Sequence, residues 1–282
     1  MKYSSFEVAG TGPTWGVAQD DELFDLGPSG LNLAQSLRGA IVNSTYANPE
    51  LAWQDAPRVS ASDVTFLPPI PDPGKILCIG MNYTSHQAET GRDRVPAPTV
   101  FTRFADSQMG HLQPAVRPLA NSLFDYEGEL ALVISKPAYR VDQADAFDFI
   151  AGYSVYNDFS VRDWQRATSQ WTPGKNFPST GAFGPYLVPP GDLGDIALLR
   201  LETSVNGEVR QSASIADLTF TIPEIIAHVS TFTPLSPGDV IVTGTPGGVG
   251  FYRDPQSLLS AGDLVEVAVS DIGVLSNTVV QG

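Results

Sequence analysis

The chain has 282 residues, 42% of them hydrophobic, which is enough for one large domain or for one domain with a small appendage. A formal net charge of −15 with scattered basic residues disfavours binding to nucleic acid. No window is apolar enough for a membrane span, and the N-terminus MKYSSFEVAG lacks the pattern of a secretory signal. The single cysteine, Cys78, fits a strand core, so we expect a soluble cytoplasmic protein without membrane partners.

The first 70 residues predict a small N-terminal α/β subdomain. Short strands are expected in SSFEVAG, TWGVAQ and ELFDL, and short helices over 31–43 and 49–55. The proline-rich stretch 67–74 cannot continue a helix or an inner strand, so it marks a boundary. We therefore expect two domains, 1–70 and 71–282.

The second of these domains is rich in predicted strands. They lie in KILCIGMN, FDYEGELALVI, FIAGYSVYND, ALLRLETSVNG, DVIVTGT and DLVEVAVSDIG. Helices are expected over 159–168 and 222–232. Strands and helices do not alternate regularly, so the sequence favours an α+β, mostly β fold.

The segment FDYEGELALVI places three carboxylates on one face of a predicted strand. Asp125, Glu127 and Glu129 are spaced by two residues, and Ala131 and Val133 continue the same face. An acidic pair on an edge strand is ordinarily solvated, but this face turns apolar, and buried like charges are costly without a cation. Hard divalent cations prefer clustered oxygen ligands, which indicates a metal site. Asp125 fits the mouth of the strand better than a ligand position.

The segment YNDFSVRDWQ supports two interpretations. Asp158, Arg162 and Gln165 fall on one face of a predicted helix. In the first interpretation Asp158 caps the helix and Arg162 makes a surface ion pair. In the second, Asp158 is a further metal ligand, and Arg162 and Gln165 donate hydrogen bonds to an anionic ligand.

The segment GMNYTSHQAETG predicts a very short helix between glycines, with Thr84 and Gln87 as a capping box. His86 and Glu89 are i, i+3 neighbours on it. Such a pair is either a surface contact or an imidazole that a carboxylate orients as a general base. The flanking glycines are typical of a segment that closes as a lid.

The glycine-rich segment IVTGTPGGVGFY follows a predicted strand but matches neither a P-loop nor a dinucleotide-binding motif. Its backbone amides and the hydroxyls of Thr243 and Thr245 can hold a carboxylate. Lys175, in a predicted loop, is a candidate charge partner for a substrate. The chain contains no nucleophile elbow, which argues against a serine hydrolase.

The order of the motifs is more specific than any one of them. KILCIGMNYTSHQAE, FDYEGELALVI, GYSVYNDFSVRDWQ, GKNFPSTGAFGPYLV, VNGEVRQSASIADLTF and LSPGDVIVTGTPGGVG together closely resemble the fumarylacetoacetate hydrolase (FAH) family, in its acylpyruvate hydrolase-like branch. The resemblance runs from about residue 75 to the end. It implies a mixed β-sandwich roll and a homodimer.

The resemblance also implies roles for nine residues. It makes Glu127, Glu129 and Asp158 the ligands of Mg²⁺ or Mn²⁺, with Ca²⁺ also compatible. His86 and Glu89 match the dyad on the family's lid, which activates water. The substrate-facing positions are matched by Lys175, Arg162, Gln165 and Thr245.

Two residues depart from the family pattern. Arg103 stands where many members have lysine, and Pro178 stands where the commoner pattern has aspartate. Both departures bear on the substrate pocket and not on the metal site.

The implied activity is metal-dependent hydrolysis of a carbon–carbon bond in acylpyruvate-like 2,4-dioxo acids. The metal would chelate the 2-oxo acid end of a small anionic substrate and reverse the repulsive local field. His86, oriented by Glu89, would activate the attacking water, and the enolate of pyruvate would leave beside Lys175.

Two other functions stay open. Oxaloacetate decarboxylation, or an isomerase or lyase reaction of a related 2-oxo acid, uses the same enolate without water attack. A non-catalytic, metal-stabilised binding protein is the third alternative, although it would not need the dyad.

Overall fold

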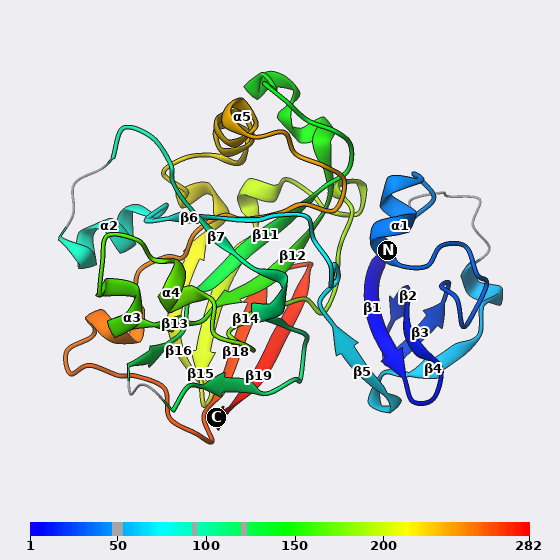
Figure 1. Ribbon diagram of the computed structural model, residues 1–282, viewed down its shortest axis with the longest axis horizontal. Coiled ribbons are helices and arrows are strands. Elements are labelled where there is room, and N and C mark those ends of the chain that lie inside the picture. Colours follow the sequence, from blue (N-terminus) through cyan, green and yellow to red (C-terminus); the bar gives the residue numbers. More distant parts are fainter. Residues whose placement is uncertain (47–52, 92–94, 120–122) are drawn as a thin grey trace.

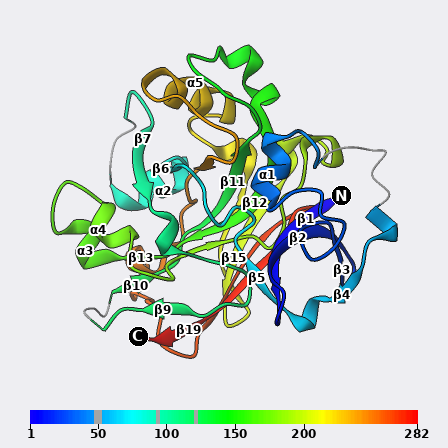
Figure 2. The same ribbon diagram turned by 45° about the vertical axis from the view of Figure 1, so that its right-hand side comes forward.

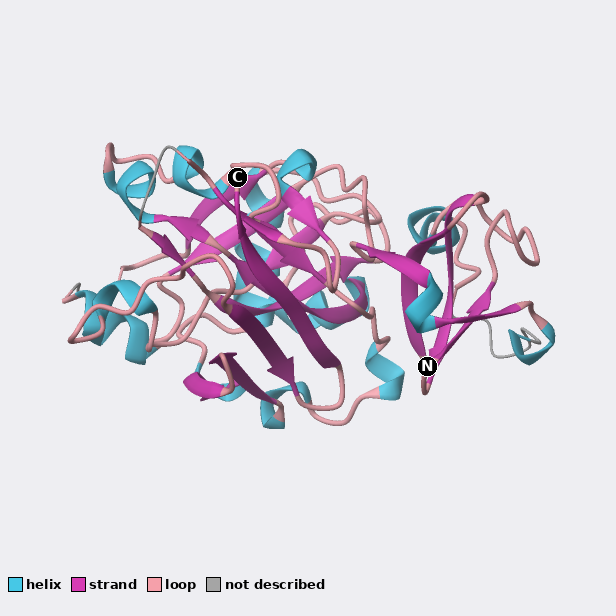
Figure 3. Ribbon diagram, turned by 90° about the horizontal axis from the view of Figure 1, so that it is seen from below, coloured by secondary structure: helices cyan, strands magenta, loops and turns pink. Residues whose placement is uncertain are grey.

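The computed structural model describes residues 1–46, 53–91, 95–119 and 123–282. Strands gather in the interior, and short helices lie at the periphery (Figure 3). The predicted fold class is confirmed, because two mixed sheets form a β-sandwich roll beside a small N-terminal sheet. Within the described residues, no helix is both long enough and apolar enough to cross a membrane.

The N-terminal sheet is antiparallel throughout, in the order β4-β3-β2-β1-β5. Its strands are β1 (Lys2–Val8), β2 (Gly12–Gln19), β3 (Glu22–Asp25), β4 (Arg58–Ser60) and β5 (Val64–Leu67). The sheet ends where the proline-rich stretch begins. The division at residue 70 stays a prediction.

The helices of the N-terminal unit differ from the expectation. Helix α1 covers only Leu37–Val42, because the Ser36 side chain accepts a hydrogen bond from the Gly39 amide and starts the helix there. Most of the helix expected over 49–55 falls on residues outside the described ranges, and Trp53–Asp55 form a 3₁₀ turn.

The central sheet has seven strands in the order β7-β6-β17-β11-β12-β14-β8. Its pairs are antiparallel except β6–β17 and β14–β8. The strands are β6 (Ile76–Gly80), β7 (Thr99–Arg103), β8 (Gln108–Met109), β11 (Gly128–Ile134), β12 (Ile150–Asp158), β14 (Gly181–Phe183) and β17 (Val240–Val242).

The second sheet of the sandwich has the order β16-β15-β18-β19-β9. Its strands are β9 (Ala115–Arg117), β15 (Arg200–Val205), β16 (Glu208–Ser214), β18 (Leu264–Val269) and β19 (Gly273–Gln281). Leu130 and Leu132 of β11 share one core cluster with Leu201 and Val267 of this sheet. A Cβ at position 128 would lie 2.0 Å from Thr203 Oγ1, so only glycine allows the two sheets to approach there.

Strand β11 is buried on both faces. Its other face presents Ala131 and Val133 to a second cluster, which includes Tyr3 and Trp15 of the N-terminal sheet. Two-sided burial explains why the segment reads as a continuous apolar run. Figures 1 and 2 show the N-terminal sheet on one side of the molecule and helices α2, α3 and α4 on the other.

The elements around the site correct four expectations. These elements are α2 (Thr84–Thr90), α3 (Arg162–Arg166), α4 (Thr172–Lys175), β10 (Phe124–Asp125) and β13 (Ser160–Val161). Helix α5 (Ile222–Phe232) has the predicted bounds. The strand expected over 124–134 is broken at 126–127, because β10 leaves the central sheet to pair with β13. That pairing also shortens the helix expected over 159–168. Asp158 therefore ends β12 and caps no helix, and Lys175 lies in a helix instead of a loop.

Candidate metal centre and active site

Three buried carboxylates meet where β11 begins and β12 ends. Glu127, Glu129 and Asp158 each offer an oxygen atom, and these atoms all lie within 4.8 Å of one another. The antiparallel register brings them together, because Gly128 pairs with Asn157, and the Asp158 amide donates to the Glu127 carbonyl at 2.9 Å. The three residues that the sequence names as metal ligands thus form one cluster.

Three cations surround two of these carboxylates. Lys175 Nζ lies 2.8 Å from Glu127 Oε2 and 2.5 Å from Asp158 Oδ2. Arg162 Nη1 lies 2.5 Å from Glu127 Oε1, and Arg103 donates to Asp158 Oδ1. Burial alone would raise the pKa of Glu127, but Lys175 and Arg162 hold that pKa at about 2.

Glu129 has no such compensation. Its Oε2 accepts a hydrogen bond from the Gly244 amide at 2.5 Å, and no cation pairs with it among the described residues. Burial, followed by repulsion from Asp158 and Glu127, raises the pKa of Glu129 well above its ordinary value. The negative charge of the cluster is therefore not offset at Glu129 by any cation that the structure describes.

The donor set fits a divalent cation. All three ligands offer carboxylate oxygens, which Mg²⁺ and Mn²⁺ prefer, and Glu129 Oε1 accepts no hydrogen bond from the described protein. A cation bound there would remove the repulsion that raises the pKa of Glu129. The acidic triad thus fits a divalent ion.

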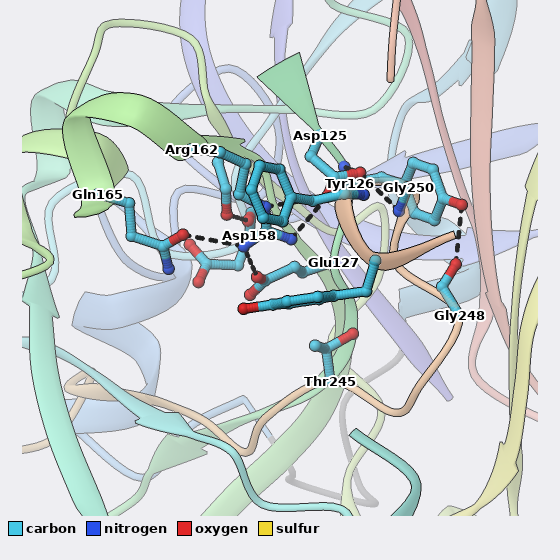
Figure 4. A network of polar contacts seen from close by, with 12 residues as sticks. Asp125, Tyr126, Glu127, Asp158, Arg162, Gln165, Thr245, Gly248 and Gly250 are labelled. Carbon is cyan, nitrogen blue, oxygen red and sulfur yellow. Dashed lines mark hydrogen bonds and ion pairs between the residues drawn. The ribbon is translucent and has the colours of Figure 1, made fainter. Parts of the chain in front are cut away.

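Asp125 lies outside this triad, as its place at the strand mouth predicts. Its oxygens accept from the backbone amides of Gly250 at 2.8 Å and Phe251 at 2.9 Å, and from Arg162 Nε at 2.9 Å. Arg162 in turn contacts Glu127 (Figure 4). Asp125 therefore positions Arg162 against Glu127 of the triad.

Arg162 makes two further contacts with side chains of the protein. Its Nη1 donates to Gln165 Oε1 at 3.0 Å, and its Nη2 lies 2.8 Å from Asp125 Oδ2. The guanidinium that the sequence assigns to the substrate is thus bound to side chains of the protein. Gln165 keeps its amide nitrogen, which has no acceptor within the described ranges.

His86, which is buried, and Glu89, which is partly buried, form a pair on α2. His86 Nδ1 lies 2.6 Å from Glu89 Oε1, and Glu89 Oε2 accepts from the Gly248 amide at 2.8 Å. Since His86 is only 7% exposed, the pair is not a surface contact. His86 Nε2 has no hydrogen-bond partner in the described part of the chain, so it is available to a ligand.

The predicted capping box is wrong. The N-cap of α2 is Tyr83, without a side-chain hydrogen bond, and Gln87 Nε2 instead donates to the Met81 carbonyl at 2.8 Å. The predicted stop is confirmed, because Gly91 ends the helix with a φ of 65°.

The glycine-rich turn binds carboxylates that belong to the protein itself. The amides of Gly244, Gly248 and Gly250 donate to Glu129, Glu89 and Asp125, respectively. The hydroxyls of Thr243 and Thr245 donate to the carbonyls of Leu130 and Gly128. One turn therefore holds Glu129 of the triad, Glu89 of the dyad, and Asp125, which positions Arg162.

Only glycine permits this arrangement at position 248. The residue has a φ of 105°, and a Cβ there would lie 2.2 Å from the Arg210 carbonyl oxygen. The turn can thus pack against the backbone of β16 at Arg210 while the Gly248 amide donates to Glu89 on α2.

A cavity of ≈ 50 Å³ lies between the triad and the dyad. It borders a larger, outer cavity of ≈ 600 Å³. Both cavities are lined by Met81, Phe101, Gln165, Arg166 and Trp171. Of the sequence-predicted residues, the inner cavity also contacts His86, Glu127, Glu129, Arg162, Lys175 and Thr245.

The expected effect of Arg103 and Pro178 on the pocket needs correction. Neither lines either cavity, because Arg103 points at Asp158, Thr180 and Ser107, and Pro178 is exposed. The sequence interpretation missed Trp171, Phe251, Tyr252, Met81 and Arg166 as lining residues. Only Arg166 carried a usable signal, since it follows Arg162 by four residues on the same helical face.

The chain is similar in sequence to known proteins. Residues 75–280 match the family model described as fumarylacetoacetate (FAA) hydrolase C-terminal. The chain is 40% identical to the human mitochondrial oxaloacetate tautomerase FAHD2A over 250 residues, which cover 88% of this chain and 79% of that protein.

Two solved structures share the fold over the whole chain. The fumarylacetoacetate hydrolase of Exiguobacterium antarcticum has a TM-score of 0.88 and 33% identity, with 100% of both chains covered. Maleylpyruvate hydrolase from Sphingobium sp. SYK-6, solved in complex with a manganese(II) ion and pyruvate, has a TM-score of 0.83 and 26% identity, again with 100% of both chains covered.

Proposed function

Because the chain belongs to the fumarylacetoacetate hydrolase family, we propose that it is a divalent-metal-dependent tautomerase that interconverts the keto and enol forms of oxaloacetate or a similar 2-oxo acid. One observation carries the proposal. The imidazole of His86, oriented by Glu89, and the ammonium of Lys175 line the same small cavity as Glu127 and Glu129 of the acidic triad. A base, an acid and a metal site thus face one small volume. The relationship to an oxaloacetate tautomerase supports this choice of reaction.

The metal site would be formed by Glu127, Glu129 and Asp158. A divalent ion bound there supplies a Lewis acid that polarises the 2-oxo group and favours its enolate. Mg²⁺ and Mn²⁺ both suit three carboxylates, and the related manganese complex supports Mn²⁺ as a first choice for experiments.

The dyad would move the proton at carbon 3. The Glu89 carboxylate accepts a hydrogen bond, so Nδ1 of His86 carries the hydrogen and Nε2 presents a lone pair. In the keto-to-enol direction, Nε2 takes a proton from carbon 3, and Glu89 stabilises the imidazolium that forms.

Lys175 would act at the oxygen on carbon 2. Its ammonium lies beside Glu127 and Asp158 and can protonate or hydrogen-bond that oxygen as negative charge develops. The net reaction moves one proton from carbon to oxygen. If Lys175 gives its proton to the oxygen, exchange with solvent returns the proton taken by His86 to Lys175, so no co-reactant is consumed.

Acylpyruvate hydrolysis, which the sequence resemblance implies, is the second candidate. The same His86 would deprotonate a water molecule in place of carbon 3. An inner cavity of ≈ 50 Å³ has room for such a water, and the relationship to maleylpyruvate hydrolase supports this reaction.

An ultraviolet assay separates the candidates. The protein would be mixed with oxaloacetate or acetylpyruvate, with Mg²⁺, Mn²⁺ or a chelator. Metal-dependent relaxation of the oxaloacetate enol signal without pyruvate supports the tautomerase. Pyruvate from acetylpyruvate would favour the hydrolase, and pyruvate from oxaloacetate the decarboxylase. No change with either compound, while the metal is bound, would contradict all three.

We further propose a homodimer, which the family resemblance implies, and a cytoplasmic location, as expected in the sequence analysis. Light scattering on the purified protein tests the first, with twice the mass of 30.1 kDa expected. Fractionation of cells that express the protein tests the second.

A further inference from the structure

We propose that Arg166 and the amide nitrogen of Gln165 form a subsite for a second substrate carboxylate, so that the protein selects 2-oxo dicarboxylates. This inference rests on the proposed function, because it assumes that the 2-oxo acid end of the substrate lies at the acidic triad. It assigns the substrate class to two residues at the boundary between the two cavities.

The arginine and lysine residues that line the inner cavity differ in their ion-pair partners. Arg162 is bound to Asp125 and Glu127, and Lys175 is bound to Glu127 and Asp158. Arg166 differs, because no carboxylate within the described ranges makes an ion pair with it. Its charge is therefore available to an anionic ligand.

Aromatic residues hold Arg166 in place without neutralising its charge. Its Nη1 donates to Tyr252 Oη at 3.2 Å, and its guanidinium carbon lies 4.9 Å from the centre of the Phe251 ring. Both aromatic residues line the inner cavity. Aromatic contacts of this kind orient a guanidinium and leave its other donors free.

Arg166 lies one turn beyond Arg162 on α3, on the side away from the triad. Arg162 and Arg166 are one helical turn apart, a rise of about 6 Å. Arg162 is buried against the triad, whereas Arg166 is exposed at the boundary of the outer cavity. A short dicarboxylate whose 2-oxo acid end lies at the triad would extend its other carboxylate in that direction.

Gln165 completes the subsite. Its Oε1 accepts from Arg162, which turns the amide nitrogen away from that guanidinium (Figure 4). The amide nitrogen and the guanidinium of Arg166 together offer several N–H donors, as a carboxylate requires. A neutral acyl group would leave these donors without an acceptor.

The charge of Arg166 also counteracts the long-range repulsion between the protein and an anionic substrate. The chain carries a net charge of −15, so its overall field repels a dianion. An unpaired guanidinium at the entrance gives a second carboxylate a favourable local partner, which the paired Arg162 and Lys175 do not offer.

The test uses two matched, unreactive ligands. Malate and 2-hydroxybutanoate share a four-carbon chain and a metal-chelating 2-hydroxy acid end, but only malate has a second carboxylate. Calorimetry with the Mn²⁺-loaded protein would compare wild type with Arg166→Met, which keeps length and apolar packing. Thr168→Ala, an uncharged change in the outer cavity, is the control.

We expect Arg166→Met to weaken malate binding roughly 10- to 100-fold, as for the loss of a charged hydrogen bond, and to leave 2-hydroxybutanoate binding unchanged. Arg166→Lys should restore part of the malate affinity, because it keeps the charge without the fork. Thr168→Ala should behave as wild type.

Three results would overturn the subsite: wild-type protein that does not prefer malate, equal losses for both ligands, or no loss in Arg166→Met. Failure of the proposed function looks different. In that case the malate preference and its loss in Arg166→Met would persist, but the wild-type protein would show no metal-dependent tautomerisation of oxaloacetate.

Discussion

Two regions of the molecule bury carboxylates in opposite ways. In the N-terminal sheet, Asp25 is 5% exposed and accepts hydrogen bonds from the Thr14 hydroxyl at 2.5 Å, the Gly27 amide at 3.0 Å and the Ser29 hydroxyl. Neutral donors thus satisfy both of its oxygens. In the central sheet, Glu129 is 2% exposed, has one backbone donor and lies beside two other carboxylates.

The difference shows that burial of a carboxylate is not itself evidence of function. Asp25 ties a turn to a strand, and its local donors match its acceptors. Glu129 has more acceptor capacity and more negative charge than the groups that contact it compensate, and this excess fits a divalent cation. Each experiment below tests whether the two regions respond differently.

The largest effect is expected at the dyad. His86→Ala should lower kcat on the true substrate roughly 10²- to 10⁴-fold, because it removes the general base that Glu89 orients. Steady-state kinetics measure this loss. His228→Ala on α5, which lines neither cavity, is the matched control and should keep full activity. A His86→Ala protein with wild-type kcat would rule out the proton-transfer role.

The next effect concerns the metal. Glu129→Gln should weaken Mn²⁺ binding roughly 100-fold or more, since it removes a charged ligand and keeps the shape of the side chain. Asp25→Asn is the control from the other region and should leave Mn²⁺ affinity unchanged. Calorimetric titration measures both. Equal affinities for wild type and Glu129→Gln would remove Glu129 from the ligand set.

The effects on the free energy of unfolding should be the reverse of those on Mn²⁺ affinity: the change at Asp25 should matter more than the change at Glu129. Asp25→Ala leaves the Thr14 and Ser29 hydroxyls without an acceptor, so the free energy of unfolding should fall by about 1–3 kcal/mol. Metal-free Glu129→Gln should be at least as stable as metal-free wild type, because a neutral amide avoids the cost that burial and the two neighbouring carboxylates impose on the Glu129 carboxyl group. Urea denaturation measures both, and a strongly destabilised Glu129→Gln would contradict the comparison.

The smallest effect is a pH dependence of the metal-free protein. The pKa of Glu129 is raised above its ordinary value of 4.5, so above that pH the folded state holds a proton that the unfolded state has released. Its contribution to the free energy of unfolding should therefore fall as pH rises through the folded pKa. Glu127, with a pKa of about 2, acts in the opposite direction only below 4.5.

Denaturation at several pH values, with and without Mn²⁺, measures this dependence. The decline should be weaker in Glu129→Gln than in wild type, and bound Mn²⁺ should suppress it. An identical decline in the variant would show that another group is responsible.

The sequence predicted that Glu127, Glu129 and Asp158 form one cluster, because the pattern that joins them is local. Glu127 and Glu129 lie on one short segment, and Asp158 follows an apolar strand that pairs with it, so the alternating pattern and one pairing suffice to join them. Helix α5 was predicted with its correct bounds, since its apolar period is uninterrupted.

The remaining features depend on contacts between distant segments. The break at 126–127 arises from pairing of β10 with β13, which no property of FDYEGELALVI encodes. The binding of Asp125 and Glu89 by the glycine-rich turn joins residues more than 120 positions apart. Trp171 and Tyr252 reach the cavity from segments without a periodic pattern. Pairing across such distances is decided by packing, which one sequence does not display.

The most direct test of the account is the rate of oxaloacetate tautomerisation by protein stripped with a chelator, before and after Mn²⁺ or Mg²⁺ is restored. We predict loss of activity on stripping and recovery on metal addition in wild type, with poor recovery in Glu129→Gln at the same metal concentration. Full activity of the stripped wild-type protein would contradict the claim that the buried triad works by holding a divalent cation.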